Sequence, residues 1–370
     1  MGDGPGPMVP DYGGACVDAV VPAILGRRRA APPWLPEPAV QAAQVVLLVL
    51  DGLGWDQLTA RADLAPTLTA MAGGPITTVA PSTTATALTS LTTGSAPAAH
   101  GVVGYRVRVA GTEVLNILRW RTIRGEDARE IVPPETFQVL EPFAGTKPPV
   151  VTRAEFAGSG FTRAHLAGVE FRGWRVTSTM VASVGALLAD RAPFVYAYYD
   201  GVDKVAHEFG LGSLYDAEVI AADRLVADVI DVLPPGAALV VVADHGQVDV
   251  GDNVVALERE VSELTGLLSG EGRFRWLHAR PGCRDRLADA ARRCHGDQAW
   301  VRTREEAEAD GWFGGGLAPE IAGRLGDVVL AAREPLAFLD TADTGAIRLR
   351  SRHGSLTREE MLVPLLAATA

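Results

Sequence analysis

Residues 45–58 read VVLLVLDGLGWDQL, an apolar run of strand length that ends in an aspartate. The same pattern returns in PFVYAYYDGVDKVAHEFG (193–210) and in ALVVVADHGQVDV (238–250), where apolar runs also lead into polar residues. A strand that is apolar along its whole length has to be covered on both faces, which is typical of a parallel sheet between two layers of helices. We therefore predict that each of the three segments begins with a buried strand.

The segments between these runs indicate helices. SLYDAEVIAADRLVADVIDVL (213–233) has the spacing of a long amphipathic helix, and ITTVAPSTTATALTSLTTG (76–94) reads as a strand, a turn at Pro81 and a helix that ends at Gly94. RLGDVVLAAR (324–333) is one more expected strand. Strands that alternate with helices predict an α/β fold with a mostly parallel central sheet and helices on both faces. Polar residues at the carboxyl ends of such strands mark the usual place of a site.

Composition divides the chain into three parts. Residues 1–40 are rich in Gly, Pro and Ala and are expected to form an N-terminal arm packed on the core. Residues 41–251 and 324–370 carry the apolar strands and form the expected catalytic core. Residues 252–323 combine two short strand patterns, a charged helix pattern and an acidic run. For them we predict a small α+β insertion that caps the site.

The overall charge and the cysteines narrow the class of protein. The chain has 370 residues, with 34 basic and 45 acidic side chains and a net charge of −11, which argues against nucleic acid as a general partner. No run approaches the roughly 18 apolar residues of a membrane span, and the N-terminus lacks a signal-peptide pattern. Cys16, Cys283 and Cys294 are too widely spaced for a disulfide framework or a CxxC metal site. We expect reduced thiols and a cytoplasmic location.

Carboxylates and imidazoles follow the apolar runs in four segments of the chain. The candidate metal ligands are Asp51, Asp203 with His207 at i,i+4, the adjacent pair Asp244 and His245, and His353 in RSRHGSL. Taken singly, each is typical of a cap, a turn or a solvated surface pair. Taken together, they are the ligand mix for zinc or a similar divalent ion with one position left open. Two such ions a few Å apart clamp the attacking and leaving oxygens of a phosphoryl transfer.

The stretch PSTTATALTSLTTG (81–94) is rich in hydroxyl side chains. Ser and Thr cap helices and fill turns far more often than they attack a substrate, so the stretch alone does not identify a nucleophile. A Thr at the start of the helix after Pro81, however, lies where backbone N–H groups and the helix dipole favour an anion. A metal bound to its hydroxyl would lower the pKa of that hydroxyl toward neutrality. The stretch is therefore a candidate phosphate cradle with its own nucleophile.

The order of these segments resembles the alkaline phosphatase superfamily, specifically its type I phosphodiesterase/nucleotide pyrophosphatase family. The resemblance spans about residues 44–365 and rests on five segments in the family's order. They are Asp51, then Pro81-Ser-Thr-Thr84 with Thr93-Gly94 and His100-Gly101, then Asp203-x-x-x-His207, then Asp244-His245-Gly, and finally His353-Gly. It implies an alkaline phosphatase-like fold, hydrolase activity and two divalent metal ions, zinc first, with manganese or iron as alternatives.

The resemblance also implies the role of each motif residue. The family's nucleophile falls on Thr84. One ion would be held by Asp51, Thr84, Asp244 and His245, and the other by Asp203, His207 and His353. Asp200 competes with Asp203, but only Asp203 stands four residues before the histidine, as the family motif requires. His100 is read as a turn residue, and His165, His278 and His295 as structural residues.

One segment departs from the family pattern. Members carry an Asn soon after the His-Gly, where it binds a phosphate oxygen, whereas this chain reads HGVVGYRVRV. Tyr105 or Arg106 would then donate to the phosphate, and Asn116, in an expected strand, is a further candidate. The loop GWFGGG (311–316) suits a mobile flap on which Trp312 and Phe313 stack against the substrate. The alternative is that both rings fill the core of the insertion.

The resemblance implies a phosphohydrolase that cleaves phosphodiester or nucleotide pyrophosphate bonds of a small phosphorylated substrate. Thr84 would attack phosphorus, and the resulting phospho-threonine would be hydrolysed. A phosphomonoesterase and a phosphonate hydrolase of the phosphonoacetate type are alternatives on the same site. An inactive binding protein on this fold is a further alternative, against which stands the fact that all seven nucleophile and ligand positions are filled.

Overall fold

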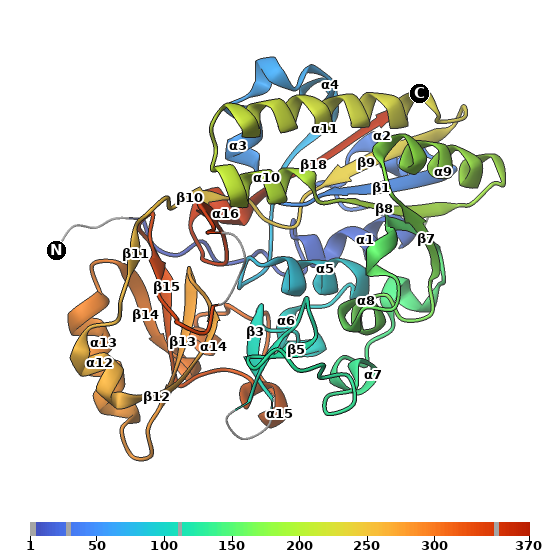
Figure 1. Ribbon diagram of the computed structural model, residues 1–370. Coiled ribbons are helices and arrows are strands. Elements are labelled where there is room, and N and C mark those ends of the chain that lie inside the picture. The colour runs from blue at the N-terminus through green and yellow to red at the C-terminus, as the bar shows by residue number, and fades with distance from the viewer. Residues whose placement is uncertain (1–4, 27–30, 110–112, 344–347) are drawn as a thin grey trace.

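A computed structural model describes residues 5–26, 31–109, 113–343 and 348–370. Within these ranges the main sheet has seven strands, in the order β2-β18-β9-β1-β8-β6-β7 (Figure 1). Their bounds are β1 Gln44–Leu50, β2 Ala72–Thr77, β6 Pro149–Arg153, β7 Glu170–Trp174, β8 Phe194–Tyr199, β9 Ala237–Val242 and β18 Leu362–Thr369. β1 pairs parallel with β8 and β9, β6 pairs parallel with β7 and β8, and β18 runs antiparallel between β9 and β2. The predicted mostly parallel α/β sheet is confirmed.

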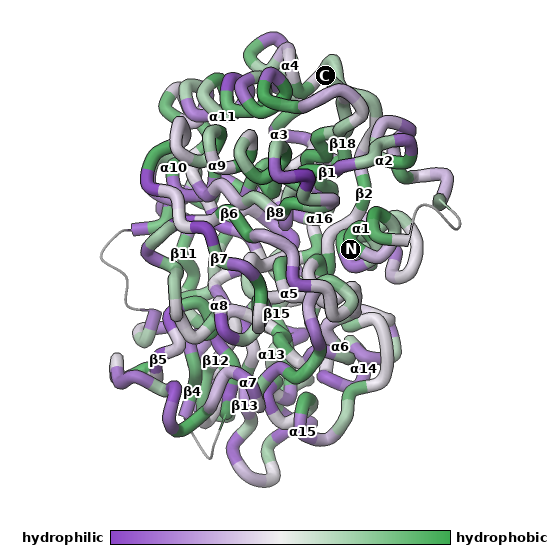
Figure 2. The backbone as a smooth tube through the Cα atoms, turned by 90° about the vertical axis from the view of Figure 1, so that its right-hand side faces the viewer, coloured by the Kyte–Doolittle hydropathy of each residue, from purple (hydrophilic) through white to green (hydrophobic). Residues whose placement is uncertain are grey.

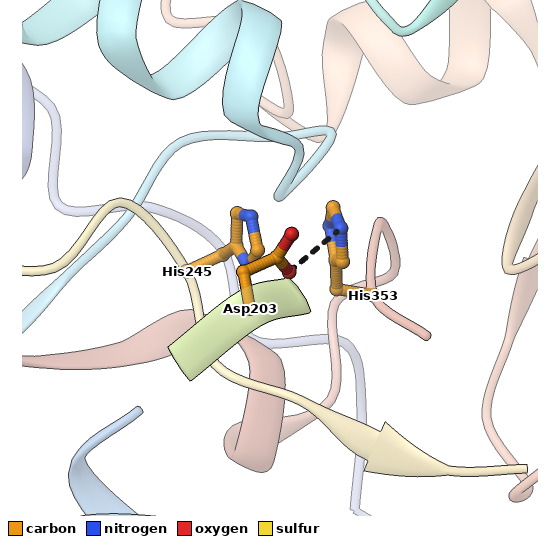
Figure 3. Close-up of side chains that lie close together, drawn as sticks. All are labelled: Asp203, His245 and His353. Atoms are coloured by element: carbon orange, nitrogen blue, oxygen red, sulfur yellow. Dashed lines mark ion pairs between the residues drawn. The ribbon is translucent and has the colours of Figure 1, made fainter. Parts of the chain in front are cut away.

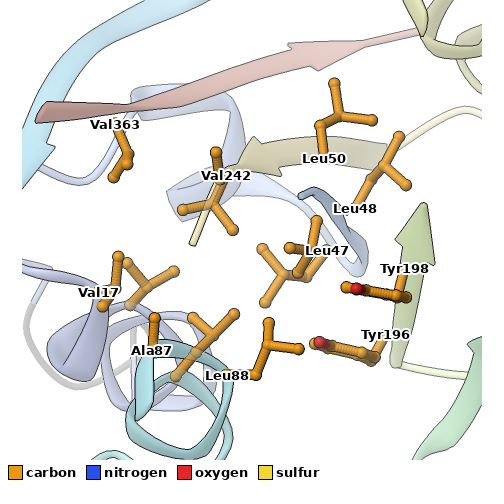
Figure 4. Close-up of a cluster of buried hydrophobic side chains, with 14 of the residues drawn as sticks. Val17, Leu47, Leu48, Leu50, Ala87, Leu88, Tyr196, Tyr198, Val242 and Val363 are labelled. Carbon is orange, nitrogen blue, oxygen red and sulfur yellow. The ribbon is translucent and has the colours of Figure 1, made fainter. Parts of the chain in front are cut away.

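Helices cover both faces of this sheet, as the apolar strands require. α11 (Ser213–Asp231), α10 (Gly201–Phe209), α9 (Thr177–Ala189), α4 (Pro66–Ala70) and α3 (Trp55–Thr59) lie on one face, and α1 (Val17–Gly26) and α5 (Thr84–Thr93) on the other (Figure 1). Figure 2 shows hydrophobic and hydrophilic residues alternating along α11, as expected of an amphipathic helix. Side chains of α1, α5 and the central strands meet in one buried cluster (Figure 4). Burial of this apolar surface is the main stabilising contribution to the fold.

A second, four-stranded sheet lies beside the first, in the order β12-β13-β15-β14. Its strands are β12 Thr265–Glu271, β13 Phe274–Ala279, β14 Ala299–Thr303 and β15 Val328–Ala332, accompanied by α12 (Arg259–Leu264), α13 (Arg284–His295) and α14 (Arg304–Ala309). The strand predicted within residues 324–333 is confirmed as β15, but it lies in this second sheet, where it pairs antiparallel with β13 and β14. Val328 and Leu330 face the cluster under α12 and α13, while Val329 and Ala331 face the main core. Burial on both faces explains the apolar run, and such a run does not specify which sheet it joins.

Shorter elements connect these two sheets. A three-stranded sheet contains β3 (Arg106–Arg108), β4 (Val114–Asn116) and β5 (Arg121–Thr122), and two-stranded pairings join β10 (Val248–Asp249) to β17 (Ser351–Arg352) and β11 (Val254–Val255) to β16 (Ala337–Phe338). The remaining α-helices are α2 Glu37–Gln41, α6 Pro97–His100, α7 Pro134–Phe137, α8 Gly160–His165, α15 Pro319–Ala322 and α16 Arg358–Met361. Short 3₁₀ helices span Ala62–Leu64, Pro142–Gly145 and Ala154–Phe156. No helix in the described ranges has the length and apolar character needed to cross a membrane.

The N-terminal segment lies across the core. The Met8 amide donates to the carbonyl of Leu356, and α1 packs against α5. The hydroxyl of Tyr12 donates to the carbonyl of Trp312 at 2.8 Å, so the segment also contacts the part of the chain assigned to the insertion. The division into arm, core and insertion stays a prediction, and β15 shows that the second sheet draws on residues beyond 252–323.

Candidate active site

Three adjacent strands place polar side chains at one edge of the main sheet. β1 lies between β8 and β9, and all three run parallel. Asp51 comes directly after β1, Asp244 and His245 follow β9, and Asp203 lies in the first turn of α10, which follows β8. Because the carboxyl ends of parallel strands meet at the same edge, four side chains from distant parts of the chain come together.

Three further side chains join them. His353 follows β17, and its ring stacks on that of His245 with the centroids 3.5 Å apart. His207 lies one turn after Asp203, and its Nε2 is 3.3 Å from the Asp203 Oδ1. Thr84 is the first residue of α5, and its Oγ1 lies 3.0 Å from the Nε2 of His245. We define the strand-end cluster as Asp51, Asp203, His207, Asp244, His245 and His353.

The cluster contains two groups whose ligand-type atoms all lie within 4.8 Å of one another. One group is Asp51, Asp244 and His245, in which the His245 Nε2 is 3.4 Å from the Asp51 Oδ1 and 3.4 Å from the Asp244 Oδ2. The other is Asp203, His245 and His353, with 3.8 Å between the His353 Nε2 and the Asp203 Oδ1 (Figure 3). His245 thus lies between the two ligand sets that the resemblance implies, and Thr84 contacts the first of them.

The three histidines of the cluster share one orientation. In each ring Nδ1 donates to a backbone carbonyl at 2.8–3.0 Å. The acceptors are Ser351 for His207, Gly246 for His245 and Ser82 for His353. A carbonyl only accepts, so the proton is on Nδ1 and the lone pair of Nε2 faces the cluster. Outer hydrogen bonds that fix a ring in this way are typical of metal-binding histidines.

The carboxylates are also arranged as a cation site would require. The Asp51 Oδ1 and the Asp244 Oδ2 are buried and have no hydrogen-bond partner among the described residues. Burial raises the pKa of Asp51 well above its usual value, and the negative charges of Asp244 and Asp203 raise it further. Burial likewise raises the pKa of Asp244, although His245 opposes that shift. A buried excess of negative charge beside three unprotonated Nε2 atoms fits a divalent cation with nitrogen and oxygen ligands.

Second contacts hold the carboxylates in place. The Asp51 Oδ2 accepts from the hydroxyl of Tyr198, and the Asp244 Oδ1 accepts from the backbone N–H of Gly52 at 3.0 Å. The Asp203 Oδ1 accepts from the Gln247 Nε2 at 2.6 Å. Tyr198 and Gln247 were not singled out from the sequence. Gln247 lies three residues after Asp244, and Tyr198 lies in the apolar run before Asp203, so neither position carries a motif.

Asp200, the competitor of Asp203, has a different environment. Its Oδ1 accepts from the Arg153 Nε at 2.6 Å, and its Oδ2 pairs with the Lys204 Nζ at 2.6 Å. The Arg153 guanidinium also lies over the ring of Trp174, 4.7 Å from the centroid. Two cations therefore already neutralise this carboxylate, whereas Asp203 faces two histidines.

Three hydroxyls of the Thr-rich helix α5 donate to backbone carbonyls of the same helix. Thr89, Thr92 and Thr93 each donate to the carbonyl four residues earlier, which is how hydroxyls are accommodated in a buried helix. Ser82 donates to the carbonyl of Ser355 at 2.6 Å and so ties the loop before α5 to the loop after His353. α5 ends as expected at Gly94, whose φ of 66° is the left-handed conformation that glycine tolerates best. Thr84 differs from these residues because its hydroxyl points to His245.

The other histidines lie outside the cluster. His100 accepts from the backbone N–H of Val102 at 3.0 Å and contacts the Ser90 hydroxyl at 2.8 Å, and burial lowers its pKa to about 3. His165 donates to the carbonyl of Phe161, which is also a contact within the fold. These contacts agree with structural roles for both.

The cluster opens into a cavity of about 850 Å³. Thr84, Asp203, His207 and His353 line its inner end, and the three-stranded sheet supplies much of the outer wall. All three candidate phosphate contacts reach this cavity: Tyr105, Arg106 and Asn116. The Asn116 Nδ2 donates to the Tyr105 hydroxyl at 2.7 Å, which leaves the hydroxyl proton free to point elsewhere. The Arg106 Nη1, in contrast, is bound to Asp340 at 2.9 Å and to Asp343.

The proposed stacking flap is wrong. Trp312 and Phe313 are both 0% exposed and do not line the cavity. Trp312 packs 5.8 Å from the ring of Phe274, and Phe313 lies 6.3 Å from that of Trp276. The three glycines suggested mobility, but burial of two large aromatic rings holds the loop against the main core rather than beside the substrate.

Other cavity residues carry no sequence signal. Arg119, Arg121 and Arg352 line the cavity, as does Glu271 from the tip of the β12–β13 hairpin. The arginines lie in short segments without periodicity, and only the position of Arg352, directly before His353, could have drawn attention to it.

The fold is shared with solved structures of low sequence identity. Murine ectonucleotide pyrophosphatase/phosphodiesterase 5, in an inactive threonine-to-alanine form in complex with AMP, is 17% identical, with 88% of each chain covered and a TM-score of 0.65. The human protein of that name is 14% identical, with 88% of each chain covered and a TM-score of 0.64. Phosphonoacetate hydrolase from Sinorhizobium meliloti 1021, in complex with phosphonoformate, is 22% identical, with 90% of each chain covered and a TM-score of 0.62.

Sequence comparison identifies the family. No curated protein matches the chain. The family model described as "Type I phosphodiesterase / nucleotide pyrophosphatase" matches residues 45–356, which include Thr84 and the whole strand-end cluster. The chain therefore belongs to the type I phosphodiesterase/nucleotide pyrophosphatase family, a family of metal-dependent hydrolases within the alkaline phosphatase superfamily.

Proposed function

We propose that the protein hydrolyses a phosphodiester or pyrophosphate bond of a small phosphorylated substrate by transferring the phosphoryl group to Thr84. The observation that carries the proposal is the position of this hydroxyl. It lies at the start of a ten-residue helix, 3.0 Å from the His245 Nε2, at the inner end of a cavity of about 850 Å³. A nucleophile, an anion-binding helix start and a set of metal-type ligands thus meet at one point.

The strand-end cluster would hold two divalent ions, which we take to be zinc because of the histidine and aspartate donors. Asp51, Thr84, Asp244 and His245 are the proposed ligands of one ion, and Asp203, His207 and His353 those of the other. Ions bound there would stabilise the charge of the phosphoryl group and lower the pKa of a coordinated hydroxyl. Manganese and iron are alternatives that the same donors accept.

The residues of the chain have distinct tasks in the reaction. The first turn of α5 leaves backbone N–H groups without intrahelical acceptors, and these bind oxygens of the phosphoryl group. The Thr84 Oγ attacks phosphorus in line with the leaving group, so that one P–O bond forms while the bond to the leaving oxygen breaks. The phosphoryl group on Thr84 still carries the second substituent of the substrate, and water attacks this ester and releases Thr84 and a phosphate monoester.

Tyr105 takes the place of the family's phosphate-binding Asn in this proposal. Its hydroxyl accepts from Asn116 and therefore keeps its own proton for a phosphoryl oxygen. Arg106 is less suited, because Asp340 and Asp343 already neutralise its guanidinium. Tyr105 would thus contact the substrate, and Asn116 would orient Tyr105.

The similarity to phosphonoacetate hydrolase keeps a phosphonate hydrolase as the second candidate, since the same nucleophile and ligands would serve a P–C bond. A phosphomonoesterase is a further candidate. We also retain the prediction of a cytoplasmic location, which the three free cysteines support.

Trapping the covalent intermediate tests the proposal. The zinc-loaded protein, quenched in acid during turnover of bis(4-nitrophenyl) phosphate, should contain a peptide in which Thr84 carries a 4-nitrophenyl phosphoryl group. Thr84→Ser provides a control, because it keeps a hydroxyl at the same position. Labelling on any other residue, or steady turnover by Thr84→Ala at the wild-type rate, would contradict the proposal.

A further inference from the structure

The cavity contains more positive charge than the proposed chemistry uses. Five arginines line it among the described residues: Arg106, Arg119, Arg121, Arg348 and Arg352. Two of them are already paired, since Arg106 binds Asp340 and Asp343, and Arg348 lies 2.9 Å from the Asp252 Oδ1. The three that remain, Arg119, Arg121 and Arg352, form what we call the arginine wall.

Among the arginine wall residues, Arg352 gives the strongest evidence for a bound anion. Its Nε is buried and has no hydrogen-bond partner, and no described carboxylate forms a salt bridge with its guanidinium. β17 fixes its backbone opposite Val248, and it directly precedes His353. A half-buried guanidinium without a hydrogen-bond partner is costly in a folded protein. It is therefore placed where an anion from outside the chain would complete its hydrogen bonds.

Arg119 and Arg121 reach the cavity from a different element. Both belong to the end of the three-stranded sheet, one before β5 and one within it. The Arg119 side chain has no hydrogen bond or salt bridge in the described ranges, and the Arg121 Nη1 bonds to the carbonyl of Gly125 at 2.6 Å. Cationic groups from two separate parts of the chain thus face one cavity.

The acidic residues of the cavity do not cancel this charge. Asp343 is paired with Arg106 and Arg275, and Asp203 belongs to the strand-end cluster. Glu271 is half-buried, and burial raises the pKa of its carboxyl well above the usual value, while a hydrogen bond from Thr83 opposes the shift. In a chain with a net charge of −11, a cavity with surplus arginines is a local exception.

The cavity also lacks the surface that a nucleobase would require. Trp312 and Phe313 are buried elsewhere, and Tyr105 is the one aromatic residue, histidines aside, among the described residues that line it. The apolar part of the lining is aliphatic, as in Leu118, Ile123 and Leu349. Such a wall suits a short linker with a charged end better than a stacked ring.

We propose that the arginine wall binds a second anionic group, a carboxylate or a phosphate, on the leaving side of the substrate. The inference rests on the proposed function, because it takes the scissile phosphorus to lie at Thr84. It goes beyond that function in assigning the substrate class: a phosphoryl compound with a further anion on a short linker, rather than one whose leaving group is neutral or a stacked base.

Three phosphonates of similar length test this assignment on the zinc-loaded protein. Butylphosphonate has a neutral tail, 3-phosphonopropionate ends in a carboxylate, and propane-1,3-diphosphonate ends in a second phosphonate, so that the two sources of charge are separated. Dissociation constants from calorimetry should be about ten-fold lower for the two charged probes than for butylphosphonate, as expected for one charge-assisted hydrogen bond. Whichever charged probe binds more tightly identifies the preferred anion.

Arginine variants test which residues account for the tighter binding of the charged probes. Arg352→Gln and Arg119→Gln should each remove most of the advantage of the charged probes and leave butylphosphonate binding unchanged. Arg124→Gln is the matched control, because Arg124 lies two residues after β5, is exposed and does not line the cavity. Zinc content is measured for every variant, since Arg352 adjoins His353. Equal losses for all three probes in Arg352→Gln, or charged probes that bind no better than butylphosphonate to the wild type, would overturn the assignment.

Together, the binding and labelling experiments distinguish the anion subsite from the proposed chemistry at Thr84. If the arginine variants show the expected pattern but the wild type forms no phospho-threonine from any phosphoester or phosphonate, the anion subsite stands and the proposed chemistry fails. If Thr84 is labelled during turnover but the charged tails bring no gain in affinity, the chemistry stands and the substrate class is wrong.

Discussion

The strand-end cluster and the arginine wall lie in one cavity but are built in different ways. Five of the six cluster residues follow three buried parallel strands, and His353 alone follows the short strand β17. Backbone carbonyls fix the rings of the three histidines. The wall lies on short antiparallel strands and a loop, and two of its three members are exposed. The contrast indicates that the sheet determines which chemistry is available, whereas the short segments around it determine which substrate arrives. Each of the following predictions tests one side of this contrast.

The largest effect is expected at the nucleophile. Thr84→Ala should lower kcat by roughly four powers of ten, because loss of a covalent nucleophile removes the step on which turnover depends. Thr86→Ala is the matched control on the same helix, since the Thr86 Oγ1 is buried without a described partner. It should cost about 1 kcal/mol or less in the free energy of unfolding and leave kcat nearly unchanged. Greater damage from Thr86→Ala than from Thr84→Ala would show that the nucleophile is assigned to the wrong residue.

The second prediction compares two neighbouring carboxylates. Asp203→Asn should reduce zinc affinity at least about a hundred-fold, because even outer contacts of metal ligands are worth ten- to a hundred-fold. Asp200→Asn should keep full zinc content but lose about 2 kcal/mol in the free energy of unfolding, since it removes the negative charge that Arg153 and Lys204 share. Metal analysis together with urea denaturation measures both quantities. The reverse pattern would make Asp200 the ligand.

The third prediction concerns the contact that replaces the family's Asn. Tyr105→Phe should lower kcat about ten-fold, which corresponds to one hydrogen bond to a charged group, without changing zinc content. Asn116→Leu should lower it less, because Asn116 orients the hydroxyl and does not contact the substrate. Steady-state kinetics on bis(4-nitrophenyl) phosphate measures both. An Asn116→Leu effect larger than that of Tyr105→Phe would make Asn116 the phosphate contact.

The smallest effect on turnover is expected at Trp312. Trp312→Ala should cost about 3–5 kcal/mol in the free energy of unfolding, because it empties a fully buried site beside Phe274. The protein that remains folded at low temperature should show an unchanged KM. A raised KM for nucleotide substrates without loss of stability would instead support the interpretation of this loop as a stacking flap.

The sequence predicts the two regions unequally, for physical reasons. Asp51 and His245 can be predicted as site residues because a fully apolar run indicates a parallel strand, and parallel strands bring their carboxyl ends together. The run at 328–332 is equally apolar but joins the second sheet, because burial on both faces does not encode the partner strands. Trp312 looks mobile from its glycines, yet its position depends on contacts with distant aromatic rings. Arg352 carries no motif, and its role depends on what the folded chain leaves unpaired.

The central claim is that the strand ends hold two metal ions beside Thr84. An anomalous difference map of zinc-loaded crystals, collected at the zinc absorption edge, tests it most directly. We expect two peaks about 4 Å apart, one among Asp51, Thr84, Asp244 and His245 and the other among Asp203, His207 and His353. A single peak at full occupancy, or an Asp203 carboxylate turned away from both peaks, would contradict it.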